Sequence, residues 1–229
     1  MTSTALVRAL TLATATALVV GCPGEPPRGG DALAALDPSV RRVAGLELEG
    51  QTLVQSTWFK GATLPLALVR GLRGWETIEG APCARFGLAV FSKEDEGDVS
   101  TEWLRPAGDR VLCPARALGS AARQVLDPPQ PVLVAPLEPG QTWRWEGTVD
   151  GVPASVDFRV KSAGERELAG EQRFAVELEH VIRAAGFEAT RVQTWAEGRG
   201  LVFEEGVLPS PDVGDAPDAF RAWVGGAAE

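Results

Sequence analysis

Apolar residues recur at every second position in several short stretches, which is the pattern of β-strands that bury one face. The alternation is clear over 156–160 and 174–178, and it appears again over 64–68 and 86–90. In the second half of the chain it predicts five strands, at about 142–149, 154–162, 172–182, 188–196 and 200–204. Among 229 residues, 26 glycines and 17 prolines separate such stretches, which favours tight turns over long helices.

A sheet with one apolar face needs a partner layer, because that face must be covered. We therefore expect a mainly β fold with a single domain over residues 31–206. It should form a curved antiparallel sheet, an open barrel or a sandwich, with one or two short helices. A first helix is expected around 31–36, before Pro38. Its continuation as far as Val43 stays open.

Two other segments have patterns of their own. Within 114–130, apolar residues lie three or four apart and Asp127-Pro128-Pro129 ends the pattern, which predicts a linking helix at about 115–126. Residues 207–229 are rich in proline and aspartate, and they predict an irregular tail.

Comparison of the chain with itself indicates a tandem repeat. A shift of ninety residues places Gly50-Gln51-Thr52 on Gly140-Gln141-Thr142 and aligns three further pairs of glycines. Glycine adopts positive φ angles easily and therefore marks turns, so equal glycine spacing predicts equal hairpins. The expected repeats of about 90 residues are two β-meanders, at about 43–113 and 133–204.

The N-terminus has the pattern of an export signal. Its apolar stretch, 9–20, would be too short as a helix, at about 1.5 Å per residue, to cross a hydrocarbon core of about 30 Å. Val19-Val20-Gly21-Cys22 resembles the lipobox of bacterial lipoproteins, which implies cleavage between Gly21 and Cys22 and attachment of lipid, palmitate included, to Cys22. We therefore predict a lipoprotein signal peptide over 1–21 and a Pro/Gly spacer over 22–30. Ordinary signal-peptidase cleavage nearby is the alternative.

The cysteine count fits this prediction. The chain has three cysteines, and assigning Cys22 to lipid leaves Cys83 and Cys113. In an oxidising compartment these two could form a disulfide, and two separate buried thiols are the alternative. No Cys-x-x-Cys motif or Cys/His cluster occurs in the sequence, so neither a metal nor a cofactor is expected.

Charge and catalytic residue types narrow the function classes. The net charge is −9 and the basic residues are scattered, which argues against nucleic acid as a partner. The single histidine, His180, follows the alternating stretch 174–178 but has no serine, cysteine or carboxylate motif beside it, so no catalytic residue is expected. Residues 93–98 hold four carboxylates in a spacing that fits no calcium loop, and a solvated hairpin tip is expected there.

Tryptophans supply the best candidate for a binding site. Trp143 and Trp145 share one face of a predicted strand, and with Trp103 and Trp195 they could line an apolar cavity for a lipid or another hydrophobic ligand. Packing in the core is the alternative for all four.

One part of the chain resembles a known group of proteins. The residues are Pro136-Leu137 followed by Gly140 and Trp143, then Ala169-Gly170, then Trp195 followed by Gly-x-Gly-Leu-Val202. These motifs are similar to those of uncharacterised exported bacterial lipoproteins of a β-rich family. That family is similar in outline to lipoprotein-carrier folds, in which a curved antiparallel sheet wraps around helices. The resemblance covers about 131–204 and implies a fold and a location, but no activity.

These features predict an exported protein that lipid anchors in a bacterial membrane. We expect the outer membrane, with the folded body facing the periplasm or the cell surface. The expected role is noncatalytic binding of an apolar ligand or of an envelope protein. A structural or assembly lipoprotein without a ligand is the alternative, and a hydrolase with an unrecognised site is the most distant one.

Overall fold

The structure is a computed structural model that describes residues 29–47, 51–56, 66–90, 98, 100–119, 121–168, 170–184, 186–208 and 218–224. In this part of the chain two helices precede twelve strands. The helices are α1 (Gly30–Ala34) and α2 (Pro38–Ala44). The strands are β1 (Gln51–Ser56), β2 (Leu66–Ile78), β3 (Ala81–Val90), β4 (Ser100–Ala107), β5 (Arg110–Leu118), β6 (Gln124–Val134), β7 (Thr142–Val149), β8 (Val152–Leu168), β9 (Glu171–Ala184), β10 (Phe187–Ala196), β11 (Gly200–Leu208) and β12 (Asp218–Val224).

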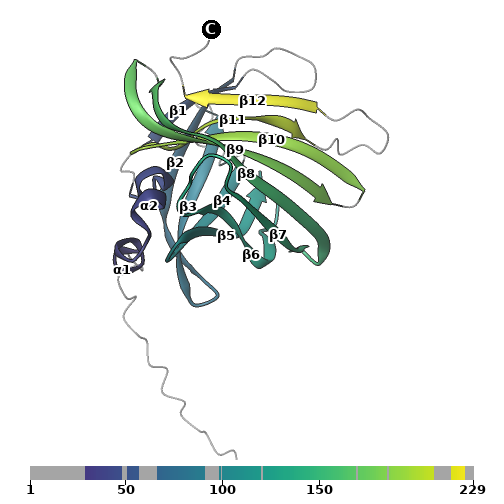
Figure 1. Ribbon diagram of the computed structural model, residues 1–229. Helices are drawn as coiled ribbons and strands as arrows, with labels where there is room; N and C mark the ends of the chain where they lie inside the picture. Colours follow the sequence, from purple (N-terminus) through teal and green to yellow (C-terminus); the bar gives the residue numbers. More distant parts are fainter. Residues whose placement is uncertain are drawn as a thin grey trace, which may run out of the picture.

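The strands form one antiparallel sheet that closes into a barrel (Figure 1). Each strand pairs with its neighbours in sequence, and β12 completes the ring by pairing with β1 at three positions. The predicted mainly β, antiparallel fold with one or two short helices is confirmed. The sheet is closed rather than open, and closure removes the unpaired edges that an open sheet would present.

The hydrophobic alternation located the strands of the second half. The strand predicted over 142–149 is β7 with the same bounds, and the next four are β8 to β11, each longer than predicted. Val156, Phe158 and Val160 on β8 are buried, as the alternation requires. We call the face that carries these three side chains, together with Leu178 and Trp195, the inner wall of the barrel. The opposite face is the outer face.

The helix predicted at about 115–126 is wrong. Residues 110–118 form β5, which pairs with β4 and β6, and β6 already begins at Gln124. Ala115 and Ala117 are buried on one face of β5, beside Trp103. Alanine favours helices, but its small side chain also fits a strand, so pairing with the neighbouring strands decided the conformation.

The irregular tail predicted over 207–229 is wrong in part. β11 extends to Leu208, and 218–224 form β12, which pairs with β11 at six positions and with β1 at three. This strand supplies hydrogen-bond partners for the backbones of β1 and β11, which would otherwise be sheet edges. Residues 209–217 and 225–229 lie outside the described part of the chain.

The barrel consists of two halves of six strands, β1 to β6 and β7 to β12. Several strand bounds agree with a shift of ninety residues: β3 begins at 81 and β9 at 171, while β5 covers 110–118 and β11 covers 200–208. The halves meet at two seams, β6–β7 and β12–β1, with two and three matched residue pairs in the described chain. The pairings within each half are longer.

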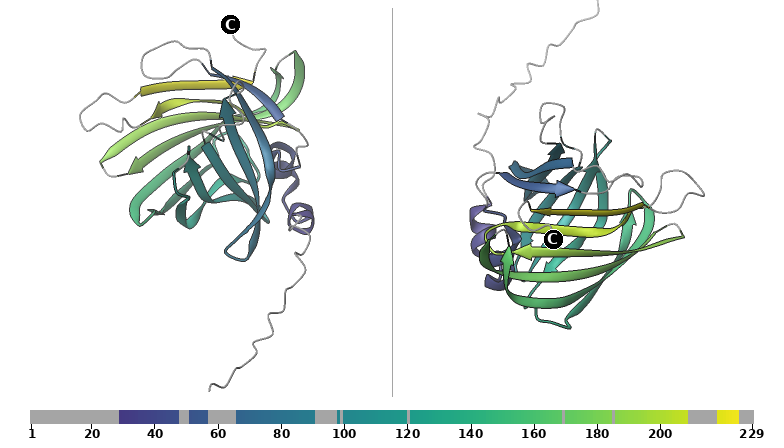
Figure 2. Two further views of the ribbon diagram at one scale, coloured as in Figure 1. Left: turned by 180° about the vertical axis from the view of Figure 1, so that it is seen from behind. Right: turned by 90° about the horizontal axis from the view of Figure 1, so that it is seen from above.

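The helices close one end of the barrel (Figure 2). α2 begins after Asp37, whose Oδ1 accepts the Ser39 N–H at 2.9 Å, and ends at Gly45 with a φ of 66°. Val40 and Val43 are fully buried in the main core cluster, which also takes side chains from β3 to β6 and from β8 to β10. The helix pair therefore fills the inside of the barrel at this end.

Candidate functional site

The four tryptophans predicted to line a cavity lie in separate places. Trp145 belongs to a cluster on β6 to β8, Trp195 to the main core, and Trp103 to a third cluster on the outer face. Trp143 lies on the inner wall between the first two clusters. Alternation along β4 places Trp103 on the outer face, opposite Ala115, while Leu104 points into the main core. A cavity lined by all four is therefore not formed.

Trp143 and Trp145 join the two halves of the barrel at the β6–β7 seam. Their indole N–H groups donate to the carbonyls of Pro131 and Pro128, at 3.0 and 2.7 Å. Proline has no N–H, so a backbone ladder cannot run along this part of β6. Gln141 Nε2 also donates to two carbonyls near the end of β6, at 2.9 and 3.1 Å. Side chains thus replace the missing backbone hydrogen bonds.

An aromatic row crosses the inner wall from β7 to β9. Trp143 stacks on Phe158, with ring centroids 5.0 Å apart and planes at 10°. The Phe158 ring lies 4.6 Å from the ring of His180, which is its partner in the β8–β9 ladder. Such ring contacts stabilise beyond the burial of apolar area alone. This side of the inner wall is therefore apolar and aromatic, and it ends in an imidazole.

His180 is 6% exposed, and its Nε2 has no hydrogen-bond partner among the described residues. Burial lowers the pKa of His180 to about 3, and the positive charge of Arg191 acts in the same direction. The imidazole is therefore neutral near pH 7. A general base works best with a pKa near the working pH, so His180 is suited to hydrogen bonding rather than to proton transfer.

Arg70 of β2 is a second buried polar side chain on the inner wall, at 9% exposed. Its guanidinium carbon lies 4.4 Å from the Phe86 ring centroid, and its Nη2 lies 3.6 Å from Glu102 Oε2. That distance is longer than a hydrogen bond, and Nη2 has no hydrogen-bond partner in the described chain. Burial lowers the pKa of Arg70, whereas the carboxylates of Glu102 and Glu204 raise it. Arg70 thus carries a buried charge that is weakly paired.

Arg191, Gln193 and Glu204 form a hydrogen-bonded group beside His180. Glu204 Oε1 accepts from Gln193 Nε2 at 2.8 Å and from Arg191 Nη1 at 3.0 Å. Gln193 Oε1 in turn accepts the indole N–H of Trp195 at 3.3 Å. Arg191 lies opposite His180 in the β9–β10 ladder. The group therefore connects the aromatic row to β11.

Arg116 adds a third cation to the inner wall. It lies between Ala115 and Ala117, which pack on the outer face, so alternation along β5 turns Arg116 inward. It also faces Glu102 in the β4–β5 ladder. In the described middle of the barrel, three arginines therefore stand against two glutamates: Arg70, Arg116 and Arg191 against Glu102 and Glu204. Among the described residues of the inner wall, the arginines therefore outnumber the glutamates by one.

His180 follows an alternating stretch in the sequence, but no role was expected for it, and the charged residues around it gave no prediction at all. Arg191 and Gln193 precede Trp195 at two-residue spacing, which places all three on one strand face. A charged residue on the same strand face as a tryptophan expected to be buried would have indicated a polar group inside the fold. Arg70 and Glu102 gave no such signal, because only the closed sheet brings β2 and β4 to face β10 and β11.

Cys83 and Cys113 are free thiols, and the predicted disulfide is not formed. β4 lies between their strands, β3 and β5. Neighbouring strands are about 4.8 Å apart, so the two Cα atoms are separated by about 10 Å, beyond the roughly 7 Å limit for a disulfide. Both thiols are buried, which raises the pKa of Cys83 and raises that of Cys113 to about 12. The alternative of two separate buried thiols describes the structure.

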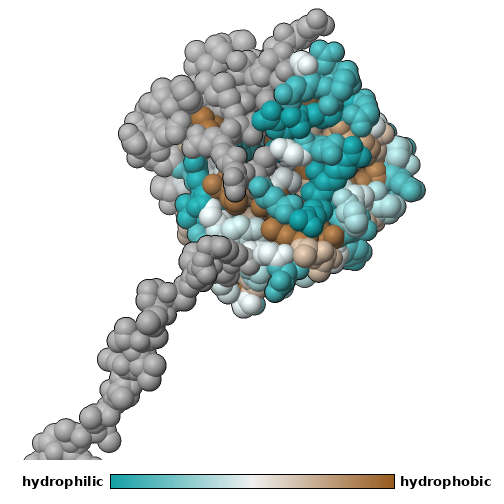
Figure 3. Space-filling model, turned by 90° about the vertical axis from the view of Figure 1, so that its left-hand side faces the viewer, coloured by the Kyte–Doolittle hydropathy of each residue, from teal (hydrophilic) through white to brown (hydrophobic). Residues whose placement is uncertain are grey.

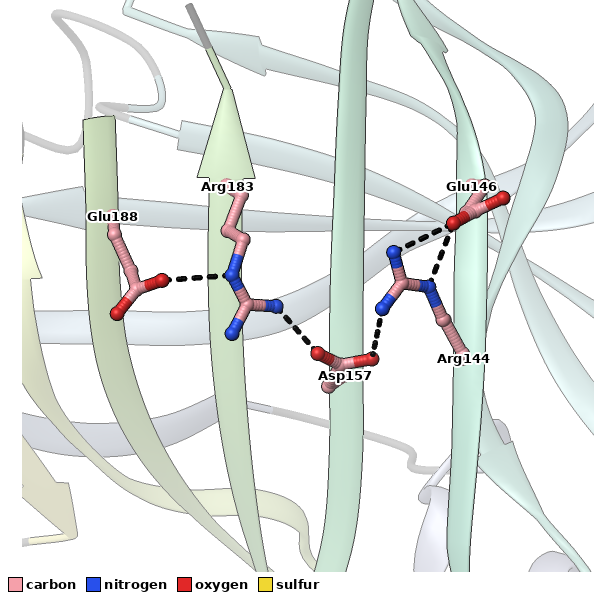
Figure 4. Close-up of polar contacts among 5 residues, drawn as sticks. All are labelled: Arg144, Glu146, Asp157, Arg183 and Glu188. Carbon is pink, nitrogen blue, oxygen red and sulfur yellow. Dashed lines mark hydrogen bonds and ion pairs between the residues drawn. The ribbon is translucent and has the colours of Figure 1, made fainter. Parts of the chain in front are cut away.

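On the outer face of β7 to β10, charged side chains pair with one another (Figure 4). Asp157 accepts hydrogen bonds from Arg144, at 3.2 Å, and from Arg183. Arg183 Nε donates to Glu188 at 2.7 Å, and Arg144 Nε donates to Glu146 at 2.8 Å. The pKa of Asp157 is lowered, chiefly by the hydrogen bond from Arg183. We call these five residues the outer ladder.

A depression of about 580 Å³ lies beside the outer ladder and is lined in part by Glu146, Arg183 and Glu188. Its charged side chains already pair with one another. The inner wall, by contrast, holds buried polar atoms that lack partners in the described chain. For this reason we place the candidate site on the inner wall.

Apolar side chains are exposed mainly at the end of the barrel away from the helices. In the described chain, the exposed large apolar residues are Leu118, Val125 and Val152, each close to a turn at that end. The described residues on the side shown in Figure 3 are mostly hydrophilic, with small separate hydrophobic patches.

Other predicted features meet the structure only in part. The described residues contain no group of three side chains that could hold a metal ion. Within the same residues, no helix has the length and hydropathy needed to cross a membrane. Gly21, Cys22 and residues 93–97 of the acidic loop lie outside the described part of the chain, whereas Asp98 pairs with Arg73 at 2.7 Å.

Comparison with known proteins gave two similar structures. No protein-family model and no curated protein matches the chain. A protein from Bacteroides fragilis, assigned as exported and with a YmcC-like fold, is 11% identical, with a TM-score of 0.40 over 77% of this chain and 94% of that chain. A protein from Parabacteroides distasonis, assigned as a lipoprotein, is 6% identical, with a TM-score of 0.31 over 75% of this chain and 91% of that chain.

Proposed function

We propose that this chain is an exported, lipid-anchored protein of the bacterial cell envelope that binds an apolar ligand on the inner wall of its barrel and catalyses no reaction. The aromatic row of Trp143, Phe158 and His180 carries the proposal. It combines buried aromatic rings with an Nε2 atom that has no partner among the described residues. Buried polar atoms are nearly always hydrogen-bonded in native proteins, so Nε2 is expected to meet a ligand.

Binding is tested on the full chain with Cys22→Ser, so that the anchor does not compete for the site. Native mass spectrometry of this protein should show a retained small molecule, and the neutral dye Nile red should compete with it. Phe158→Leu should weaken dye binding, because it removes the middle ring of the aromatic row. Asp157→Asn, its neighbour on the outer face, is the matched control. Absence of both the adduct and dye binding would contradict the proposed function.

The anchor is a separate part of the proposal. The lipobox-like Val19-Val20-Gly21-Cys22 supports cleavage before Cys22 and its acylation, with the outer membrane as the expected site. Wild-type protein should sediment with membranes, whereas Cys22→Ser should appear in the soluble fraction. Continued membrane association of that variant would contradict the anchor.

We also propose that the two halves are tandem repeats, which the agreement of strand bounds at a shift of ninety residues supports. Repetition explains why the barrel has two short seams, because each half brings one free strand to each junction. The repeat does not predict which residues bind a ligand, because the charged residues of the inner wall differ between the two halves.

A protein partner of the envelope is a second candidate. The exposed residues Leu118, Val125 and Val152 favour it, because they lie at one end of the barrel. Crosslinking in whole cells should then capture a partner with the wild type and lose it with Leu118→Ser. Unchanged crosslinks with this variant would remove the candidate.

A further inference from the structure

We infer that the inner-wall ligand is an amphiphile with a single negative charge on its polar head, a carboxylate or a phosphate ester, and that Arg70 binds this head. This inference rests on the proposed binding function and specifies the chemical class of the ligand. Three observations carry it: the charge balance of the inner wall, the surroundings of Arg70, and the apolar row beside them.

Among the described residues, the inner wall carries one more arginine than glutamate, and Arg70 is the most buried of the three arginines. Arg191 is paired with Glu204 at 3.0 Å, which leaves Arg70 and Arg116 to share Glu102. A charge inside a protein without a counter-charge is costly, because the apolar surroundings do not solvate it. A ligand with one negative charge would balance the described inner wall.

Arg70 is the member of the set best placed to bind that charge. Its Nη2 lies 3.6 Å from Glu102 and has no hydrogen-bond partner among the described residues. A guanidinium binds carboxylates and phosphates through parallel N–H donors, and Phe86 keeps one face of this group covered. Gly200 lies beside this group, because a Cβ built there would be 3.7 Å from Arg70 Nη1.

The same residues disfavour both a head with two negative charges and a head with a positive charge. Glu102 and Glu204 act on Arg70 electrostatically, so a second negative charge on the head would be repelled. A cationic head would face three arginines. The rings of the aromatic row would contact the apolar part of the amphiphile, and His180 Nε2 supplies one neutral hydrogen-bonding group.

The test compares probes that share their acyl chains and differ in whether the head carries a negative charge, on the full chain with Cys22→Ser. Palmitate is paired with methyl palmitate, and phosphatidylglycerol with diacylglycerol. We expect binding of the charged member of one or both pairs to be at least about tenfold tighter. A preference in the first pair assigns a carboxylate head, and one in the second pair assigns a phosphate head.

Arg70→Met should abolish this preference while leaving the binding of the neutral probe in place. Arg183→Met, which removes an arginine from the outer ladder, is the matched control and should keep the preference. If Arg70→Met does not fold, judged by circular dichroism, Arg116→Gln should still reduce the preference by lowering the inner positive charge. Equal binding of both members in both pairs overturns this inference while the proposed apolar binding stands. Loss of all binding to the parent protein overturns both.

Discussion

The two faces of β7 to β10 use charged and polar side chains in opposite ways. On the outer face, Asp157 and its neighbours satisfy one another in a half-exposed ladder. On the inner wall, one residue further along β8, Phe158 packs against a buried His180 whose Nε2 has no partner in the described chain. An unmade hydrogen bond of a buried group costs about 1–3 kcal/mol. The comparison therefore separates a face whose charged groups satisfy one another from a face that keeps a buried polar atom without a partner among the described residues.

The largest contrast between the faces should appear in adjacent residues of β8. Phe158→Ala removes a ring that is 2% exposed and lies between Trp143 and His180, so we expect a loss of about 3–5 kcal/mol in the free energy of unfolding. Urea unfolding monitored by tryptophan fluorescence measures it. A loss below about 1 kcal/mol would show that the aromatic row is not part of the packed core.

Acid should destabilise the protein through His180. Burial lowers the pKa of this imidazole from its ordinary value of 6.5 to about 3 in the folded protein, so the unfolded chain binds the additional proton as the pH falls through 6.5. The stability present above pH 6.5 is then lost towards pH 3, with a slope approaching about 1.4 kcal/mol per pH unit.

The chain offers a direct control, because His180 is its single histidine. His180→Leu should flatten the stability profile between pH 6.5 and about 5, above the range in which carboxylates titrate. An unchanged slope in this variant would mean that His180 is accessible to solvent and protons. Urea midpoints across a pH series give the profile.

The seam between the halves should show a smaller effect. Trp145→Phe keeps most of the ring but leaves the carbonyl of Pro128 without its 2.7 Å donor, so a loss of about 1–2 kcal/mol is expected. Hydrogen exchange should rise locally in β6 and β7 and stay unchanged in β9 and β10. A uniform rise over the whole barrel would indicate instead that the seam does not open on its own.

The smallest effect belongs to the outer ladder. Asp157→Asn should change the free energy of unfolding by less than about 1 kcal/mol, because solvent and salt screen a half-exposed ion pair. The change should vanish in high salt. An effect as large as that of Phe158→Ala would abolish the distinction between the two faces.

Short-range patterns in the sequence were sufficient for much of the fold. The alternation around Phe158 located β8 and its buried face, and glycines such as Gly80 and Gly170 lie in turns with φ of 76° and 79°. The same reasoning failed at 115–126, since alanines fit both a helix and a strand. It failed again at Cys83 and Cys113, where the spacing in sequence says nothing about the strand between them.

The candidate site was predictable only where a single strand contains it. The sequence places His180 after an apolar stretch on its own strand, but it gave no reason to expect a binding role for it. Arg70, Glu102 and Glu204 come from three strands that the sequence does not show to face each other. The balance of positive and negative side chains inside the barrel depends on which strands face each other, so no single segment of the sequence reveals it.

The amino-acid sequence by itself therefore determined the β class, the strand positions in the second half and which residues of β8 are buried, because these depend on the two-residue period of a strand. Only the tertiary structure decided that the sheet closes through β12 and that tryptophans replace backbone bonds at a proline-rich seam. It also decided that Arg70, Arg116 and Arg191 meet Glu102 and Glu204 in the described interior. Those features depend on contacts between distant segments, and such contacts exist only after the chain has folded.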